Sequence, residues 1–207
     1  MSARAVRLVA PACLIVLTLA VAPPALAQER PQLLPTRDVS VTYRVTGARA
    51  QGGMPQMTLS WLAARQAMRM DMGGMGWLVA DHRAQRGFMV MEQMRMVMDV
   101  PMEQALALPT RASFRRTGQD RVAGLPCTVW NFQDGADRGT ACVTADGVTL
   151  RAQGTSGGES GSMEATRVTY AAQDPARFQR PQGYQALQMP QGMPPGMLQG
   201  IPGMPRR

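Results

Sequence analysis

Apolar and polar residues alternate along much of the chain. The clearest run is Val39 to Thr46, in which every second residue is Val or Tyr and the residues between them are Ser, Thr or Arg. A period of two is typical of a half-buried β-strand. Further runs that predict short strands cover residues 57–63, 68–72, 77–80, 87–91, 94–100 and 163–171.

One stretch predicts a helix instead. Pro101 to Leu108 begins with proline, continues with good helix formers and ends before Pro109. The whole pattern predicts a mainly β fold, namely a curved antiparallel sheet or an incomplete β-barrel of about nine short strands. We expect the single helix to plug or cover one side of this sheet.

Two Asp-Gly pairs organise the second half of the domain. If Cys127 and Cys142 face each other across a hairpin, the loop midpoint falls between Asp134 and Gly135, a preferred type I′ turn pair. Asp146-Gly147 then turns the chain into a third strand. This register predicts that one face carries Trp130, Phe132, Ala141, Val143, Ala145, Val148, Leu150 and Ala152. The other face carries Asn131, Thr140, Thr144, Thr149 and Arg151 with the two cysteines.

The N-terminus has the pattern of a secretory signal peptide. Arg4 and Arg7 precede an apolar stretch from Leu8 to Ala22, and Ala25-Leu26-Ala27 predicts cleavage after Ala27. A lipoprotein signal at Cys13 is disfavoured because the apolar stretch continues beyond it. The stretch is also shorter than a spanning helix requires. We expect a periplasmic or secreted protein with no transmembrane segment after cleavage.

The two remaining cysteines and the composition of the chain define the rest of its organisation. Cys127 and Cys142 predict a structural disulfide in an exported domain, and their wide spacing disfavours a redox pair.

Residues 1–27 form the signal peptide, 28–37 a linker and 38–172 the β-rich domain. Residues 173–207, rich in Pro, Gly, Met and Gln, predict a disordered tail, and 154–161 predict a flexible Gly/Ser loop.

The charged residues do not indicate a nucleic-acid partner. All 22 basic residues are Arg and 14 residues are acidic, which gives a formal net charge of +8. Because the Arg residues alternate with acids and the protein is exported, they predict a solvated face. A single histidine, His82, lies in a predicted turn and is interpreted as a solvated loop residue. Without nucleophile and base pairs or a phosphate-binding loop, we expect neither catalysis nor a cofactor.

The 18 methionines are the unusual feature. Most stand at alternate positions of the predicted strands, including Met89 and Met91, so they form stripes on single faces of the sheet. The candidate ligand-facing residues are Met57, Trp61, Met68, Met70, Met72, Trp77, Met94, Met96 and Met98. Three interpretations stay open. Methionine fills the core, or it forms an adaptable apolar surface for a lipid, an acyl chain or an apolar protein segment. In the third, Met68, Met70, Met94 and Met96 bind Cu(I) through their thioethers.

Several short motifs resemble the bacterial domain-of-unknown-function family 4412. The motifs are Val41-Thr42-Tyr43-Arg44-Val45, Met68-Arg69-Met70-Asp71, Trp77 to Asp81, Arg95 to Pro101, Val122 to Cys127 and Ala141 to Val148. The family is similar in outline to periplasmic carriers of outer-membrane lipoproteins, and the resemblance covers residues 38–172. It implies an incomplete β-barrel around helices, with an apolar cavity for lipid. It therefore implies a binding protein and favours lipid over copper.

Overall fold

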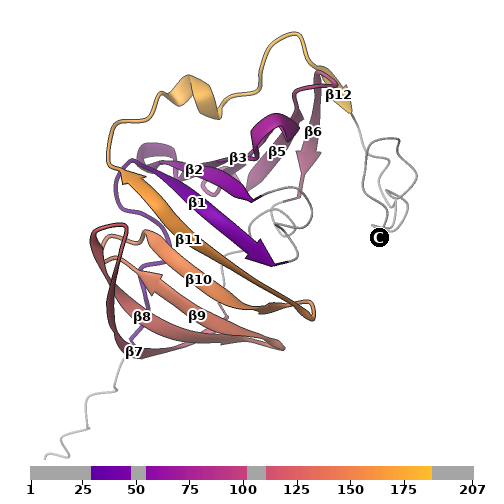
Figure 1. Cartoon of the computed structure of the whole chain (residues 1–207). Helices are drawn as coiled ribbons and strands as arrows, with labels where there is room; N and C mark the ends of the chain where they lie inside the picture. Colours follow the sequence, from indigo (N-terminus) through magenta and orange to yellow (C-terminus); the bar gives the residue numbers. More distant parts are fainter. Residues whose placement is uncertain (1–28, 48–54, 102–110, 188–207) are drawn as a thin grey trace, which may run out of the picture.

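A single mixed sheet of twelve strands forms the fold (Figure 1). The computed structural model describes residues 29–47, 55–101 and 111–187. The first six strands are β1 (Val39–Gly47), β2 (Gln56–Leu62), β3 (Ala67–Asp71), β4 (Trp77–Asp81), β5 (Arg86–Met91) and β6 (Met96–Val100). The others are β7 (Ser113–Val122), β8 (Leu125–Asp134), β9 (Asp137–Val143), β10 (Thr149–Ser156), β11 (Glu159–Thr169) and β12 (Gln185–Leu187).

The sheet is curved but does not close into a barrel, which confirms the predicted fold class. Its strand order is β12-β6-β5-β4-β3-β2-β1-β11-β10-β9-β8-β7, so β12 and β7 form the two edges. All neighbouring strands are antiparallel except β12 and β6, which are parallel. The expected helix from Pro101 to Leu108 lies outside the described residues after its first position. No helix in the described ranges is long and apolar enough to cross a membrane.

The central strand β1 joins the two halves of the sheet. It pairs with β2 on one side and with β11 on the other, although β11 follows it by more than a hundred residues. Val39, Val41, Tyr43 and Val45 are all buried, as their alternation predicts. The Tyr43 hydroxyl donates a hydrogen bond to the Thr149 carbonyl oxygen at 2.6 Å, which satisfies the one polar atom of this buried row.

Cys127 and Cys142 form a disulfide with their Cα atoms 5.4 Å apart. The hairpin register around it differs from the prediction. Cys142 lies opposite Val129, so the disulfide joins diagonal neighbours. The two central turn residues are Gly135 and Ala136, and only Gly135 has a positive φ, as in a type II′ turn. Because the register moves by two positions, both cysteines still share a face.

The third strand of this meander departs further from the prediction. Ala141 lies opposite Ala152 as expected, but the pairing shifts between Thr149 and Arg151. This β-bulge places one extra residue, Leu150, in β10. Val148 and Leu150 therefore pack in the core with the disulfide and β1, whereas Trp130 and Val143 pack in a separate cluster. The prediction that Val148 and Leu150 share a face with Trp130 and Val143 is therefore wrong.

The sequence pattern also missed parts of two strands and the whole of a third. Residues 154–161, expected to form a flexible loop, instead continue β10 and begin β11, and the chain turns at Gly157-Gly158. Strand β7 pairs only with β8 and exposes eight of its ten residues, so it lacks the buried alternation that identifies a strand. An edge strand formed mainly by backbone pairing leaves little apolar signal in the sequence.

Four glycines lie side by side across four neighbouring strands. Gly47 of β1 is opposite Gly161 of β11, which is opposite Gly154 of β10, which is opposite Gly139 of β9. A Cβ atom at Gly139 would overlap the Gln153 carbonyl oxygen, because the neighbouring backbones approach so closely. Glycine in a strand interior typically marks a tight bend or such a close approach. This row allows the sheet to bend sharply there.

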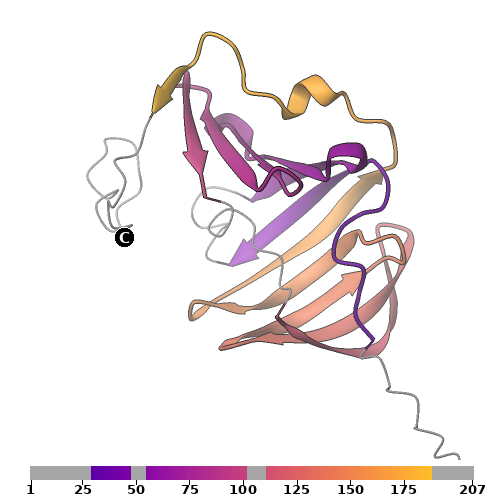
Figure 2. The ribbon, with the colours of Figure 1, turned by 180° about the vertical axis from the view of Figure 1, so that it is seen from behind.

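The segment before β1 packs along the β7 to β10 half of the sheet (Figure 2). The sequence predicts a linker at residues 28–37. In the structure, Leu33 and Leu34 pack against two core clusters, and the Thr36 amide donates to the Asp146 carbonyl oxygen at 2.9 Å. Arg37 also pairs with the Asp146 carboxylate at 2.8 Å.

The segment after β11 returns across the outer face of β2 to β6. Its composition predicts a disordered tail. Residues 173–187, which we call the covering segment, instead contain a 3-10 turn, η3 (Pro175–Phe178), and strand β12. Phe178 is 1% exposed and lies in a core cluster with Leu62, Ala67, Val79, Phe88, Val90 and Val97. Asp38 links the start of the covering segment to the end of β2, because its carboxylate accepts hydrogen bonds from the amides of Gln173 and Ala63, each at 2.8 Å. Residues 188–207 lie outside the described ranges.

Phe178 anchors the covering segment, so its loss is expected to destabilise the domain. Phe178→Ala should lower the free energy of unfolding by about 3–5 kcal/mol, the usual range for truncating a buried Phe. Urea denaturation followed by tryptophan fluorescence measures this change. The neighbouring Gln179 is exposed, and Gln179→Ala should change stability by less than about 0.5 kcal/mol. Equal stability of the two variants would show that the segment does not pack against the sheet.

Candidate functional site

The strand register places the predicted methionine stripes on one face of the sheet. Trp61 lies opposite Met68, and a second row runs through Leu59, Met70, Leu78, Met89 and Met98. A third pair, Met91 and Met96, lies opposite each other at the end of β5 and β6. Residues that oppose each other in neighbouring strands share a face. The methionine face consists of Met57, Leu59, Trp61, Met68, Met70, Leu78, Met89, Met91, Met96 and Met98.

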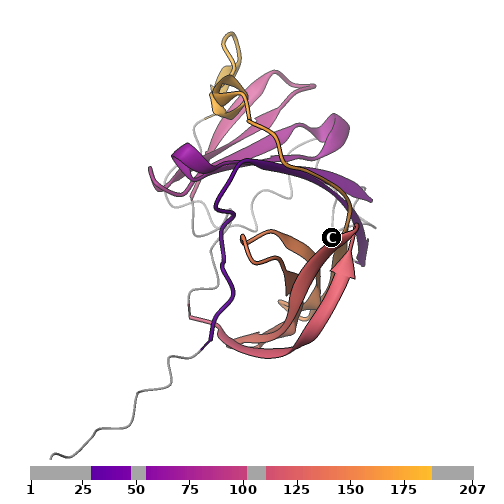
Figure 3. The same cartoon turned by 90° about the vertical axis from the view of Figure 1, so that its left-hand side faces the viewer.

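The covering segment lies on the other side of these strands. The residues that contact Phe178 alternate with those of the methionine face along each strand. Figure 3 shows the sheet curving away from η3, so the methionine face looks toward the concave side. Met57 and Met98 are buried, whereas Met68, Met70, Met89, Met91 and Met96 are only half-buried. An apolar surface that stays partly accessible is available for a ligand.

Three of the predicted ligand-facing residues do not belong to this face. Met94 lies in the turn between β5 and β6 and is 50% exposed, so the predicted strand from residue 94 begins two residues too early. Met72 follows β3 in a turn that closes through a 2.9 Å hydrogen bond from its amide to the Gly76 carbonyl oxygen. Trp77 points to the opposite face, where the Arg69 guanidinium lies 4.4 Å from its ring centroid.

Trp61 and His82 form one end of the methionine face. Their ring centroids are 5.8 Å apart and their planes are tilted by 48°. His82 follows β4 directly, and its amide donates to the Gln66 carbonyl oxygen at 3.0 Å. The buried Trp61 Nε1 and His82 Nε2 atoms have no hydrogen-bond partner among the described residues. His82 is therefore a half-buried residue beside the candidate site and not the solvated loop residue expected from the sequence.

The environment of His82 keeps its imidazole uncharged. Burial lowers its pKa below the usual value of 6.5, and the nearby negative charge of Asp81 raises the pKa but only in part. Asp81 itself remains ionised. Burial raises the pKa of this carboxyl. Hydrogen bonds from the Ala84 amide and from Arg65, at 2.9 Å, together with the positive charges of Arg65 and Arg86, lower the pKa by more.

The residues proposed for copper are not brought together. Met68 and Met70 lie on β3 and Met96 on β6, with β4 and β5 between them. At about 4.8 Å per strand, β3 and β6 are roughly 14 Å apart, too far for one ion to bind both. Met94 lies outside the face. In the part of the chain that the structure describes, no three His, Cys, Asp or Glu side chains form a possible metal site.

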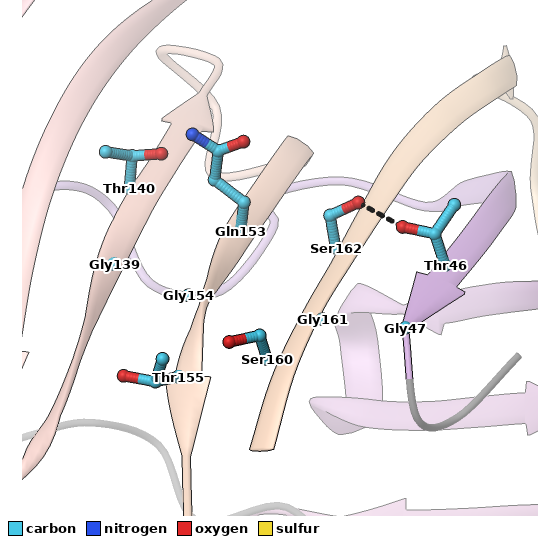
Figure 4. A pocket seen from close by; sticks show the side chains of 10 residues that line it. All are labelled: Thr46, Gly47, Gly139, Thr140, Gln153, Gly154, Thr155, Ser160, Gly161 and Ser162. Atoms are coloured by element: carbon cyan, nitrogen blue, oxygen red, sulfur yellow. Dashed lines mark hydrogen bonds between the residues drawn. The ribbon is translucent and has the colours of Figure 1, made fainter. Parts of the chain in front are cut away.

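A hollow lies over the glycine row (Figure 4). It is an open groove lined by hydroxyl and amide side chains, among them Thr46 and Ser162, whose oxygen atoms are 2.7 Å apart. Thr46 and Ser162 alternate with Val45 and Met163, so the groove opens on the other face of β1 and β11. It therefore belongs to a polar surface distinct from the methionine face.

No family model and no curated protein matches the sequence, so membership of family 4412 is not confirmed. Solved structures do resemble the fold. An uncharacterized conserved protein from Thermus thermophilus has a TM-score of 0.53 at 12% identity, covering 74% of this chain and 91% of that one. MucB from Pseudomonas aeruginosa, in complex with MucA, has a TM-score of 0.47 at 16% identity, and the match covers 77% of this chain but only 62% of MucB. A LolA superfamily protein from Nitrosomonas europaea has a TM-score of 0.39 at 7% identity, covering 72% and 93%. The similarity to the Thermus protein supports the fold alone.

The pKa of His82 can be measured directly, because it is the only histidine of the chain. In NMR titrations of its imidazole protons, the folded protein should titrate below 6.5, and the urea-denatured protein near 6.5. Asp81→Asn should lower the folded value further, because it removes the charge that raises it. Since the unfolded chain binds the proton more tightly, stability should fall as the pH drops through 6.5. His82→Gln should weaken this dependence, and a folded pKa at or above 6.5 would contradict the burial of the ring.

Proposed function

We propose that this chain is an exported binding protein, without catalytic activity of its own, that holds an apolar ligand against the methionine face. The observation that carries the proposal is the register, which collects ten apolar residues from five consecutive strands on one side of the sheet. A lipid or an acyl chain is the ligand class that fits such a surface.

Partial burial distinguishes this face from ordinary core packing. The opposite side of the same strands is covered by Phe178 and Tyr184 of the covering segment. On the methionine face, five methionine side chains remain half-buried in the folded chain. Contiguous apolar surface that stays accessible is typical of an interaction site.

Methionine is suited to this task because its unbranched thioether side chain adapts to irregular shapes. A Leu or Val surface has fewer rotatable bonds and would favour one shape of ligand. The cysteine pair and the N-terminal sequence pattern support export to the periplasm or beyond. The disulfide belongs to the scaffold in this proposal, because it packs in the core beside β1.

Acyl binding to the methionine face should depend on its central row. Met70→Gln with Met89→Gln should weaken uptake of a fluorescent acyl probe at least about tenfold. The reason is that placing an amide in apolar surroundings costs roughly 1–3 kcal/mol and 1.4 kcal/mol equals a factor of ten. Met75 and Met94 are exposed in turns outside the face, so Met75→Gln with Met94→Gln is the matched control and should bind like the wild type.

Mass spectrometry of the protein purified from its native envelope provides an independent measurement. Denaturing conditions should release co-purified lipid from the wild type and less from the Met70/Met89 variant. A wild-type protein that carries no lipid and takes up no acyl probe would refute the proposed function. Equal loss of binding in the control variant would show that methionine content, and not the face, is responsible.

One observation supports Cu(I) binding as a second candidate function. Met89 lies opposite Met98, and Met91 lies opposite Met96, so β5 and β6 place four thioethers in a two-by-two arrangement on one face. Directly opposite residues have Cβ atoms about 4.5–5.5 Å apart, which long thioether side chains can span. Thioether sulfur is a soft ligand that selects Cu(I).

This second candidate predicts a copper affinity confined to β5 and β6. Titration of Cu(I) against a competing chelator should give weaker binding for Met91→Leu with Met96→Leu, by about tenfold or more if two of four ligands are lost. Met68→Leu with Met70→Leu should leave the affinity unchanged. Leucine keeps the apolar surface, so acyl-probe binding should persist in both variants. The same copper affinity in all three proteins would exclude the four-methionine site.

A further inference from the structure

Two buried nitrogen atoms lie without partners at one end of the methionine face. Trp61 Nε1 belongs to a side chain that is 1% exposed, and His82 Nε2 belongs to the neighbouring ring, 5.8 Å away between centroids. Strand β3 lies between their elements, and Met68 of that strand is opposite both Trp61 and Ala80. Both rings therefore lie at one end of the apolar face that the proposed ligand occupies. Because the two nitrogens are buried, neighbouring side chains must move aside for a ligand to reach them.

An indole N–H can only donate a hydrogen bond, and a buried donor without an acceptor is unfavourable. His82 is uncharged in this environment, so one of its ring nitrogens carries a proton and the other accepts. If the proton is on Nε2, both rings present a donor. One oxygen atom with two lone pairs can accept both hydrogen bonds.

We propose that the acyl carbonyl oxygen of the ligand accepts hydrogen bonds from Trp61 Nε1 and His82 Nε2. The ligand is then an amphiphile with its carbonyl end beside these two rings. Its hydrocarbon chain lies along the methionine face toward Met89 and Met98. This inference rests on the proposed function and adds the ligand's chemical class and its direction. A free fatty acid and an acyl ester both supply the required oxygen.

Trp77 provides a control within the same sheet. Its Nε1 atom is also buried without a partner among the described residues, but its ring points to the opposite face and packs against Arg69. His82 does not adjoin it there. A ligand on the methionine face should therefore leave the Trp77 indole unaffected.

The indole N–H signals report on this hydrogen bond directly. The chain contains three tryptophans, so ¹⁵N-indole labelling gives three signals. Trp77→Phe and Trp130→Phe assign them by elimination, without altering Trp61. Decanoic acid and methyl decanoate should both move the Trp61 proton signal downfield, whereas decane, which lacks oxygen, should bind without that shift. The Trp77 signal should stay in place with all three probes.

Affinity provides the second measurement. Trp61→Phe and His82→Phe should each weaken decanoate and methyl decanoate binding by about tenfold more than they weaken decane binding. Decane loses only apolar contact with the ring, whereas the two oxygen-containing probes also lose one buried hydrogen bond. Trp77→Phe should change none of the three affinities. Because the indole signals are read in proteins that keep Trp61, poor folding of Trp61→Phe does not remove the test.

The possible outcomes separate the two proposals. Binding of all three probes with the same affinity and an unmoved Trp61 signal would overturn the carbonyl site and leave apolar binding intact. A shift with decane as large as that with decanoic acid would also overturn it, because packing alone would then explain the change. If no probe binds, the proposed function itself fails. Binding of the ester but not the acid, or the reverse, supports the carbonyl site and identifies its source.

Discussion

The pairing of β1 with both β2 and β11 is the constraint on which the rest of the structure depends. These two neighbours belong to opposite ends of the domain sequence, and without β1 the strands β2 to β6 would have no strand pairing with the half that contains the disulfide. The alternation of β1 also decides which residues of the neighbouring strands lie on the same face as its own buried residues. Because Val39 is opposite Trp61 and Tyr43 is opposite Met57, the buried side of β1 continues directly into the methionine face. A register shift of one residue between β1 and either neighbour would move the side chains of that half of the sheet to the opposite face.

The pattern of the sequence was sufficient wherever one face of a strand is buried. In β4 both faces are buried, and Trp77 points to the face opposite the predicted one. The condition holds for β1 to β3 and for β5, and there the predicted faces agree with the register. It fails at β7, where backbone pairing without buried side chains leaves no periodic signal. It also fails at Leu150, because a β-bulge adds one residue to a strand and neither turn residues nor cysteine spacing reveals it. The copper set failed for a similar reason. Sequence shows which residues share a strand, whereas the strand order decides which strands are neighbours.

The covering segment explains why one face of the first half is available and the other is not. Composition suggested disorder, since the segment has few apolar residues. Yet a single Phe178 packs in one cluster with residues of five strands, β2 to β6. The chain before it is held by the hydrogen bond from the Gln173 amide to Asp38, and the chain after it by the pairing of β12 with β6. The average composition of a segment cannot reveal that one side chain anchors it and that both of its ends are held by hydrogen bonds. The consequence for function is an asymmetry, because the outer face is packed by the chain itself and the methionine face retains accessible apolar surface.

The polar atoms at the rim of that surface separate the two explanations of the methionines. If methionine only fills a core, the residues around it should be satisfied within the chain, as the Tyr43 hydroxyl is through Thr149. Trp61 and His82 do not follow this rule, although both lie where the apolar rows end. The sequence signal of His82 was weak, because a histidine after a strand usually reaches solvent. Here its position two residues after Ala80 continues the alternation of β4, so its ring turns toward the methionine face. Nitrogen atoms without partners at one end of an apolar surface give a bound ligand a preferred orientation on it.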